Sequence, residues 1–218
     1  MTATAFHYRQ MELFVAAFAI LGAIAIGAIS PGPSFVVVAR TAIAVSRRDG
    51  LATAFGMGVG GLVFASAALL GLHVVLTNVP WAYLAIKIAG AAYLLYLAVR
   101  LWKGARDPIA MSDMRANVAH GVLKSFVFGL ATQLSNPKTA IWYASIFTAF
   151  LSPEQPQGLA IVIPPMIFVI EAGWYALVAV AFSSAGPRRG YLRLKPWVDR
   201  TAGSVMGLLG LKLIWDTR

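Results

Sequence analysis

The sequence predicts an all-α integral membrane protein of six transmembrane helices, arranged as two inverted three-helix repeats in which spans one and four are broken by proline. Three observations predict this fold. Hydrophobic residues make up 59% of the 218 residues and charged residues only 12%, whereas soluble domains have about 45–50% and about 25%. The apolar residues form continuous runs long enough to cross a bilayer. Two of these runs also carry a proline motif at matched positions.

The first half of the chain, about 11–103, forms repeat one. Its spans are expected at about 13–39, 51–76 and 81–102. The first span is interrupted by Pro31-Gly32-Pro33, and an asparagine and a proline at 77–80 mark the turn between the second and third spans.

The second half, about 120–216, forms repeat two, and the whole chain 1–218 is a single membrane domain. Its spans are expected at about 121–151, 158–182 and 197–215. The fourth span is broken by Asn136-Pro137-Lys138, and polar connectors are expected at 103–120, 152–156 and 187–196. Because each half has an odd number of spans, the two copies must insert with opposite topology. Inverted repeats that open with a broken helix are typical of secondary transporters, although chance similarity between glycine-rich apolar helices remains the alternative.

The basic residues predict the orientation. The connectors after spans one, three and five hold many Lys and Arg, and those after spans two and four hold none. Basic connectors stay in the cytoplasm, so both termini are expected in the periplasm, although Arg9 argues weakly against this. The net charge of +10 is therefore explained by orientation in the lipid bilayer, and no nucleic-acid partner is expected.

Two polar segments lie where a bilayer makes them costly. Ser30-Pro31-Gly32-Pro33-Ser34 contains two prolines, which remove backbone donors and free carbonyl groups. Such backbone is tolerated at membrane depth where it packs on protein or lines a cavity, so the segment is either a site or a plain kink. The second segment runs from Gln133 to Lys138. A lysine at a helix centre costs about 2.5–3.5 kcal/mol, and its ammonium could hold a substrate carboxylate together with the N-terminus of the half-helix that follows Pro137.

Glu171 is interpreted as the only carboxylate inside a span. A protonatable carboxylate at this depth is what proton-coupled exchange requires. The alternative is a structural ion pair between Lys138 and Glu171, and both interpretations can hold together.

Enzyme chemistry finds no support in the sequence. There are no cysteines, and the sequence has no His-Glu-x-x-His or Gly-x-Ser-x-Gly motif. We therefore expect no catalytic residues, no metal and no cofactor. The glycine pattern at 56–61 lies inside a span and favours close helix packing, within the chain or in a homodimer.

Three motifs together resemble the LysE/RhtB amino-acid exporter family: Ser30-Pro31-Gly32-Pro33, the segment 90–97, and Phe128-Gly129-Leu130 leading to Asn136-Pro137-Lys138. The resemblance covers about 11–215. It implies an exporter of small amino acids or their analogues in the bacterial inner membrane, coupled to protons, with Pro31, Gly32, Pro33, Asn136, Pro137 and Lys138 as its motif positions. The competing interpretation is a channel or a non-transporting membrane subunit of a larger complex.

The chain departs from the family pattern at two positions. It has Ser34 where members often have asparagine, and Gly61 where they often have an acidic or polar residue. Glu171 is similar to the acidic residue that members carry in span five. Because a cationic substrate would need a second carboxylate, a neutral amino acid is favoured. The expected substrate-binding residues are Pro31, Gly32, Pro33, Ser34, Gln133, Asn136, Pro137 and Lys138, with Glu171 coupling to protons.

Overall fold

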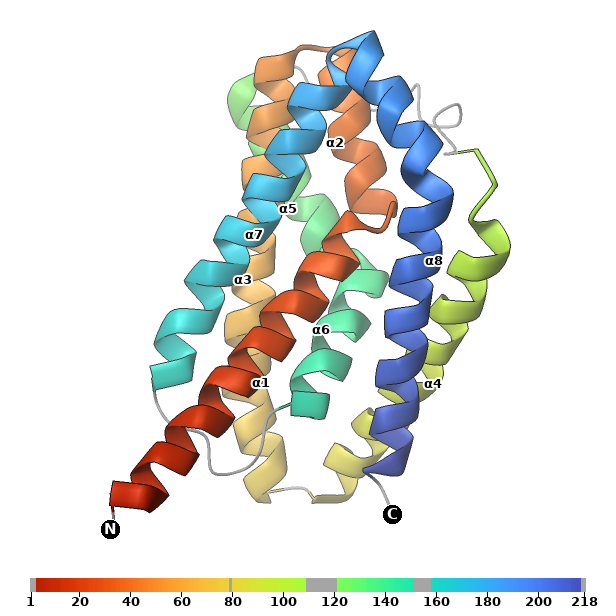
Figure 1. Ribbon diagram of the computed structural model, residues 1–218. Helices are drawn as coiled ribbons and strands as arrows, with labels where there is room; N and C mark the ends of the chain where they lie inside the picture. The colour runs from red at the N-terminus through yellow and green to blue at the C-terminus, as the bar shows by residue number, and fades with distance from the viewer. Residues whose placement is uncertain (1–2, 79, 109–120, 151–157, 217–218) are drawn as a thin grey trace.

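The computed structural model describes residues 3–78, 80–108, 121–150 and 158–216. All regular structure in these ranges is helical, which confirms the all-α prediction (Figure 1). The helices are α1 (Ala3–Ile29), α2 (Pro33–Ala44), α3 (Arg47–Asn78), α4 (Pro80–Gly104), α5 (Val122–Leu134), α6 (Pro137–Phe150), α7 (Gly158–Phe182) and α8 (Ala185–Trp215). The connectors expected at 103–120 and 152–156 fall largely or wholly at 109–120 and 151–157, outside the described residues.

The described helices include several that are long and apolar enough to cross a membrane. Three qualify singly, at Arg47–Gly71, Leu84–Gly104 and Leu159–Phe182. A fourth qualifies if α1 and α2, which are bent by 53° at their break, form one span. Large apolar side chains cover the outside of these helices, among them Phe18, Leu70, Ile161 and Leu177. The chain is thus a helical membrane protein, while the six-span inverted repeat stays a prediction.

The prediction that the segment 187–196 is a connector between helices is wrong. These residues belong to the first turns of α8, with Pro196 inside the helix. Tertiary packing stabilises these turns, because the Tyr191 ring stacks on Phe35 at 4.9 Å and meets Phe182 edge to face at 5.6 Å. Charge and proline content indicated a connector, but such packing outweighs local propensity.

Glycines allow the central helices to approach closely. A Cβ atom at Gly56 of α3 would collide with the backbone of α5 at Phe126, and one at Gly129 of α5 would collide with the backbone of α3 at Thr53. A Cβ at Gly58 would lie 2.6 Å from that of Ala172 in α7. The packing role predicted for the glycine pattern is confirmed, and these contacts are internal to the chain. A homodimer stays a prediction.

Two apolar clusters lie at different heights of the bundle. One includes Ile24, Phe147 and Ile167, and the other includes Phe35 and Tyr175. Along α7, Glu171 lies between Ile167 and Tyr175, and along the first half of the chain the α1–α2 break lies between Ile24 and Phe35. A polar layer therefore separates the two clusters, and it holds the predicted site.

The first turn of α1 and the last turn of α8 lie at one end of the bundle (Figure 1). The connection from α2 to α3, the end of α4 and the start of α8 lie at the opposite end, shown at the top. Arg47, Lys103 and Arg188 belong to these segments, so we call this the basic end.

Candidate functional site

Both proline motifs break a helix and begin a new one. Proline has no backbone N–H and fixes φ near the helical value, so it is favoured at the first position of a helix and restrains the residue before it from helical geometry. Pro33 and Pro137 are the first residues of α2 and α6. Gly32 precedes α2 with an extended backbone. Asn136 caps α6, since its Oδ1 accepts a hydrogen bond of 3.0 Å from the backbone N–H of Lys138.

The two breaks meet through a chain of buried hydrogen bonds. The Ser34 hydroxyl donates to Gln133 Oε1 at 2.6 Å and accepts from Asn136 Nδ2 at 3.1 Å. Gln133 Nε2 in turn donates to Glu171 Oε2 at 2.7 Å. Residues that lie about a hundred positions apart in the sequence are thus joined, and the predicted residues Ser34, Gln133 and Asn136 form one site with Glu171.

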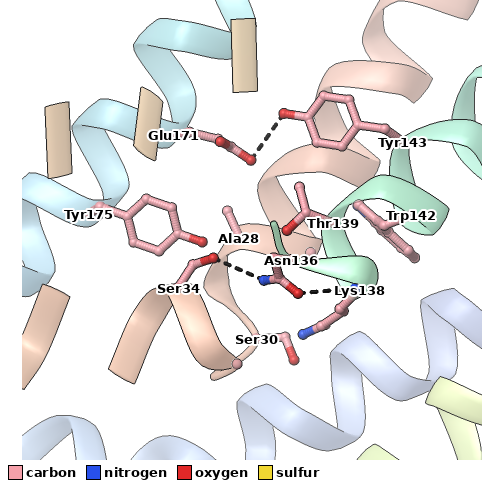
Figure 2. Close-up of a pocket in the computed structure, with 12 residues that line it drawn as sticks. Ala28, Ser30, Ser34, Asn136, Lys138, Thr139, Trp142, Tyr143, Glu171 and Tyr175 are labelled. Atoms are coloured by element: carbon pink, nitrogen blue, oxygen red, sulfur yellow. Dashed lines mark hydrogen bonds between the residues drawn. The ribbon is translucent and has the colours of Figure 1, made fainter. Parts of the chain in front are cut away.

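Glu171 is only 3% exposed, and donors hold both of its carboxylate oxygens. The second donor is the Tyr143 hydroxyl of α6, 3.0 Å from Glu171 Oε1 (Figure 2). Among the described residues Glu171 forms no ion pair, so the direct Lys138–Glu171 pair considered from the sequence is absent there. The carboxylate is held by neutral donors instead.

The Lys138 ammonium points into the site. Its Nζ lies against Gly32, where an added Cβ would be 3.0 Å away. Within the described ranges Nζ makes no hydrogen bond and no ion pair. The buried Ser30 hydroxyl, which lies beside Lys138 in Figure 2, also lacks a hydrogen-bond partner among the described residues. An ammonium and a hydroxyl are therefore both available to a ligand.

Two cavities meet at Lys138. A small cavity of about 30 Å³ is lined by Lys138, Glu171 and Tyr143, together with Gly27, Ala28, Ser30, Gly32, Ser34, Asn136, Thr139, Trp142 and Tyr175. A larger cavity of about 840 Å³ is also lined by Lys138 and reaches Lys103 and Asp107 at the basic end. Pro31, Gly32, Pro33, Asn136 and Pro137 line this larger cavity as well. Lys138 thus faces a path from the basic end and also a small chamber that contains Glu171.

Several side chains at the site carry little signal in the sequence. Thr139 and Tyr175 are ordinary residues of apolar helices, and only the cavity distinguishes them. Trp142 and Tyr143 follow the second helix break by one to two turns, and they line the small cavity together with residues of the first break. The glycine at 61 is informative only with the fold known, because a Cβ there would lie 2.8 Å from Glu171 Cδ.

The sequence profile described as "LysE type translocator" matches residues 25–217, which include both breaks, Glu171 and all of α8. The chain belongs to this family. Family membership makes it a membrane translocator and not an enzyme.

Individual relatives agree with the family match. The LysE type chain is 34% identical to the threonine efflux protein of Salmonella typhi, over 85% of this chain and 90% of the relative. It is also 34% identical to the threonine efflux protein of Escherichia coli K12, over the same shares. The homoserine/homoserine lactone efflux protein of Salmonella typhimurium is 27% identical, over 85% of this chain and 89% of the relative. No solved structure matches the chain significantly.

Proposed function

We propose that this translocator is a secondary-active exporter of small amino acids or their analogues in the bacterial inner membrane, working by alternating access in exchange for protons. Neutral amino acids are the favoured substrates. The relatives are named for the efflux of threonine and of homoserine and its lactone, and the site chemistry suits a zwitterion of this size.

The observation that carries the proposal is the Lys138 ammonium, which has no partner in the described part of the chain and lines a cavity at the junction of two broken helices. An ammonium in a membrane-embedded site is costly unless it has a partner. A substrate carboxylate supplies that partner. It would also accept from the Ser30 hydroxyl, which has no partner among the described residues. The N-terminus of α6, at which Lys138 is the second residue, adds a favourable dipole.

We assign Glu171 two roles in turn. Its carboxylate binds the substrate ammonium, and it carries a proton when the substrate is absent. It lines the same small cavity as Lys138, and in the occupied state one α-amino acid would bridge the two groups. When the ammonium binds, the carboxylate gives up its proton, and when the substrate leaves, the carboxylate takes a proton again. One proton is then exchanged for each zwitterion.

The remaining motif residues shape the site. Pro31, Gly32 and Pro33 free the backbone at the first break, and the absence of a side chain at Gly32 leaves room for Lys138 Nζ. Pro137 begins α6 and Asn136 caps it. Ser34 and Gln133 connect that cap to Glu171 through hydrogen bonds. Ligand binding at Lys138 and protonation of Glu171 would therefore affect the same hydrogen-bond network.

Alternating access is supported by the asymmetry of the cavities. The larger cavity leads from Lys138 to the basic end, which the positive-inside rule places in the cytoplasm. Toward the other end, the Tyr143 ring stacks on Phe147 at 6.1 Å and tilts against Phe64 at 5.6 Å. These three residues line a further cavity of about 250 Å³, and Tyr143 also lines the small one. This arrangement suits a state that takes up substrate from the cytoplasm.

The proposal is tested with purified protein in liposomes preloaded with the common amino acids and homoserine. A pH gradient is imposed, and the released compounds are identified by mass spectrometry. We expect selective, saturable and gradient-dependent release that is lost in Lys138→Ala. Lys212→Ala is the matched control, because Lys212 is exposed and pairs with Asp216 at the end of α8; release by this variant should be normal.

Two results would contradict the proposal. Release that does not saturate and does not discriminate among the compounds would favour a channel. Normal, selective release by Lys138→Ala would exclude Lys138 as the group that holds the substrate.

A further inference from the structure

The larger cavity is lined by a buried carboxylate that the sequence analysis did not single out. Asp199 of α8 is only 2% exposed and lines this cavity together with Lys138. Its Oδ2 accepts a hydrogen bond of 2.7 Å from Lys195 Nζ, one turn earlier in the helix. Its Oδ1 is buried and has no hydrogen-bond partner among the described residues.

Lys195 cannot satisfy both oxygens of Asp199. Its Nζ also donates to the backbone carbonyls of Gly104 and Ala105, at 3.2 Å each, where α4 ends. An ammonium has three donors, and these three acceptors use them. A buried carboxylate oxygen without a donor is unfavourable and calls for an explanation. A ligand in the cavity would provide the missing donor.

The three charged groups are distributed over the two cavities in an ordered way. Of the two cavities that Lys138 lines, Asp199 lines the larger one and Glu171 lines the small one. Other charged groups on the larger cavity are Arg100, Lys103, Asp107 and Lys195. A substrate that comes from the basic end therefore meets Asp199 and Lys138 before it can reach Glu171.

We propose that Asp199 and Lys138 form an outer binding subsite for an α-amino acid, in which Asp199 Oδ1 accepts from the ammonium and Lys138 donates to the carboxylate. This inference rests on the proposed function. The substrate then moves inward with its carboxylate still on Lys138, while its ammonium passes from Asp199 to Glu171. The substrate can occupy both positions by pivoting about its carboxylate, which stays on Lys138.

The charge balance of the larger cavity agrees with a neutral zwitterion. Basic groups outnumber acidic groups along its lining, and Lys195 already neutralises Asp199. An additional positive side chain on the substrate would meet repulsion there. The group that Asp199 recognises is therefore the α-ammonium, which all α-amino acids share.

The test is equilibrium binding to purified full-length protein, with two ligands that differ at one group. Threonine carries the α-ammonium, and 2,3-dihydroxybutanoic acid has a hydroxyl in its place. We expect wild type to prefer threonine. In Asp199→Asn that preference should fall about tenfold or more, the magnitude typical of a lost hydrogen bond to a charged group. Asp199→Glu, which keeps the charge, should largely preserve the preference.

Lys195→Met separates ligand binding from a structural role. It breaks the same ion pair but keeps the Asp199 carboxylate, so the preference for threonine should be maintained or increased. The inference is overturned if Asp199→Asn weakens both ligands equally, or if Lys195→Met loses the preference as well. Gel filtration and thermal unfolding of each variant verify that it is folded.

Binding to Lys138→Ala distinguishes failure of the inference from failure of the proposed function. If wild type binds threonine and Lys138→Ala does not, the proposed function stands whatever Asp199→Asn shows. If wild type binds neither ligand, both are overturned.

Discussion

Gly61 allows a carboxylate to lie at the centre of the helix bundle. A Cβ atom at this position would be 2.8 Å from Glu171 Cδ and 2.9 Å from the Tyr143 hydroxyl oxygen, and both distances are too short for real contacts. A larger side chain at 61 and the observed position of Glu171 are therefore mutually exclusive. Gly61, where the chain departs from the family pattern, therefore leaves the room that Glu171, the acidic residue of span five, occupies.

Gly61→Ala should consequently impair transport more than folding. The added methyl group must displace Glu171 or Tyr143, and a small misplacement of a functional group can lower a rate by about tenfold or more. We expect threonine release from liposomes to fall by that factor. Gly71→Ala in the same helix is the matched control, because its Cβ would meet nothing within 4 Å. Equal activity of both variants would contradict this account.

The sequence was informative about residues whose burial is costly. Lys138 and Glu171 were found because charged side chains in apolar runs need a functional explanation, and the structure brings both to one cavity. Asp199 was missed, although it lies within the span expected at 197–215, because Glu171 was taken as the only carboxylate inside a span. The Lys195–Asp199 spacing of one helical turn is a signal that could have revealed the buried pair.

At the level of helices, Asp49 connects two helix N-termini. Ser46 caps the start of α3: the backbone N–H of Asp49 donates to Ser46 Oγ at 3.0 Å, and the Ser46 hydroxyl donates to Asp49 Oδ2. Asp49 Oδ1 also accepts from the backbone N–H of Gly121 and the hydroxyl of Ser125, both at 2.9 Å. One buried carboxylate thus fixes the start of α3 against the start of α5.

Asp49→Ala should destabilise the protein without changing the site. It leaves the backbone N–H of Gly121 and the buried hydroxyl of Ser125 without this acceptor, and it removes the carboxylate oxygen that accepts from the Ser46 hydroxyl; together these losses cost about 2–4 kcal/mol. We expect a clear decrease in the thermal unfolding midpoint in detergent. Asp216→Ala is the control, because an exposed ion pair contributes little. An unchanged midpoint in Asp49→Ala would show that this link does not stabilise the fold.

The breaks could be predicted from the sequence, whereas their meeting could not. Proline removes a backbone hydrogen bond in a helix, but Pro164, Pro165 and Pro196 lie inside the continuous helices α7 and α8. At the two breaks the proline follows Gly32 or Asn136, and this combination marked their positions in the sequence. The contact from Ser34 to Gln133 depends on how α2 packs against α5. That packing depends in turn on the glycines of α3, whose partners the sequence does not specify.

For the whole molecule, the predicted topology places the basic end in the cytoplasm and both termini in the periplasm. The chain has no cysteines, so single cysteines can be labelled without background. Gly186 is exposed at the basic end, and Asp216 is exposed just after α8. These two positions report on opposite ends of the bundle.

In spheroplasts, an impermeant maleimide should label Asp216→Cys directly and Gly186→Cys only after the membrane is permeabilised. The reason is the concentration of Lys and Arg at the end that contains Gly186. The reverse labelling pattern would invert the orientation. Labelling of both positions from outside would contradict the prediction that α8, which separates them, crosses the membrane.

The central claim is that a single buried site exchanges an amino acid for a proton at Glu171. The most direct test is the proton movement that threonine drives in liposomes loaded with threonine and a pH-sensitive dye, with no imposed pH gradient. As threonine leaves, wild type should acidify the interior. Glu171→Gln, which keeps the size of the side chain, should exchange labelled threonine without acidification. Equal acidification by Glu171→Gln, or threonine efflux from wild type without proton movement, would contradict the account.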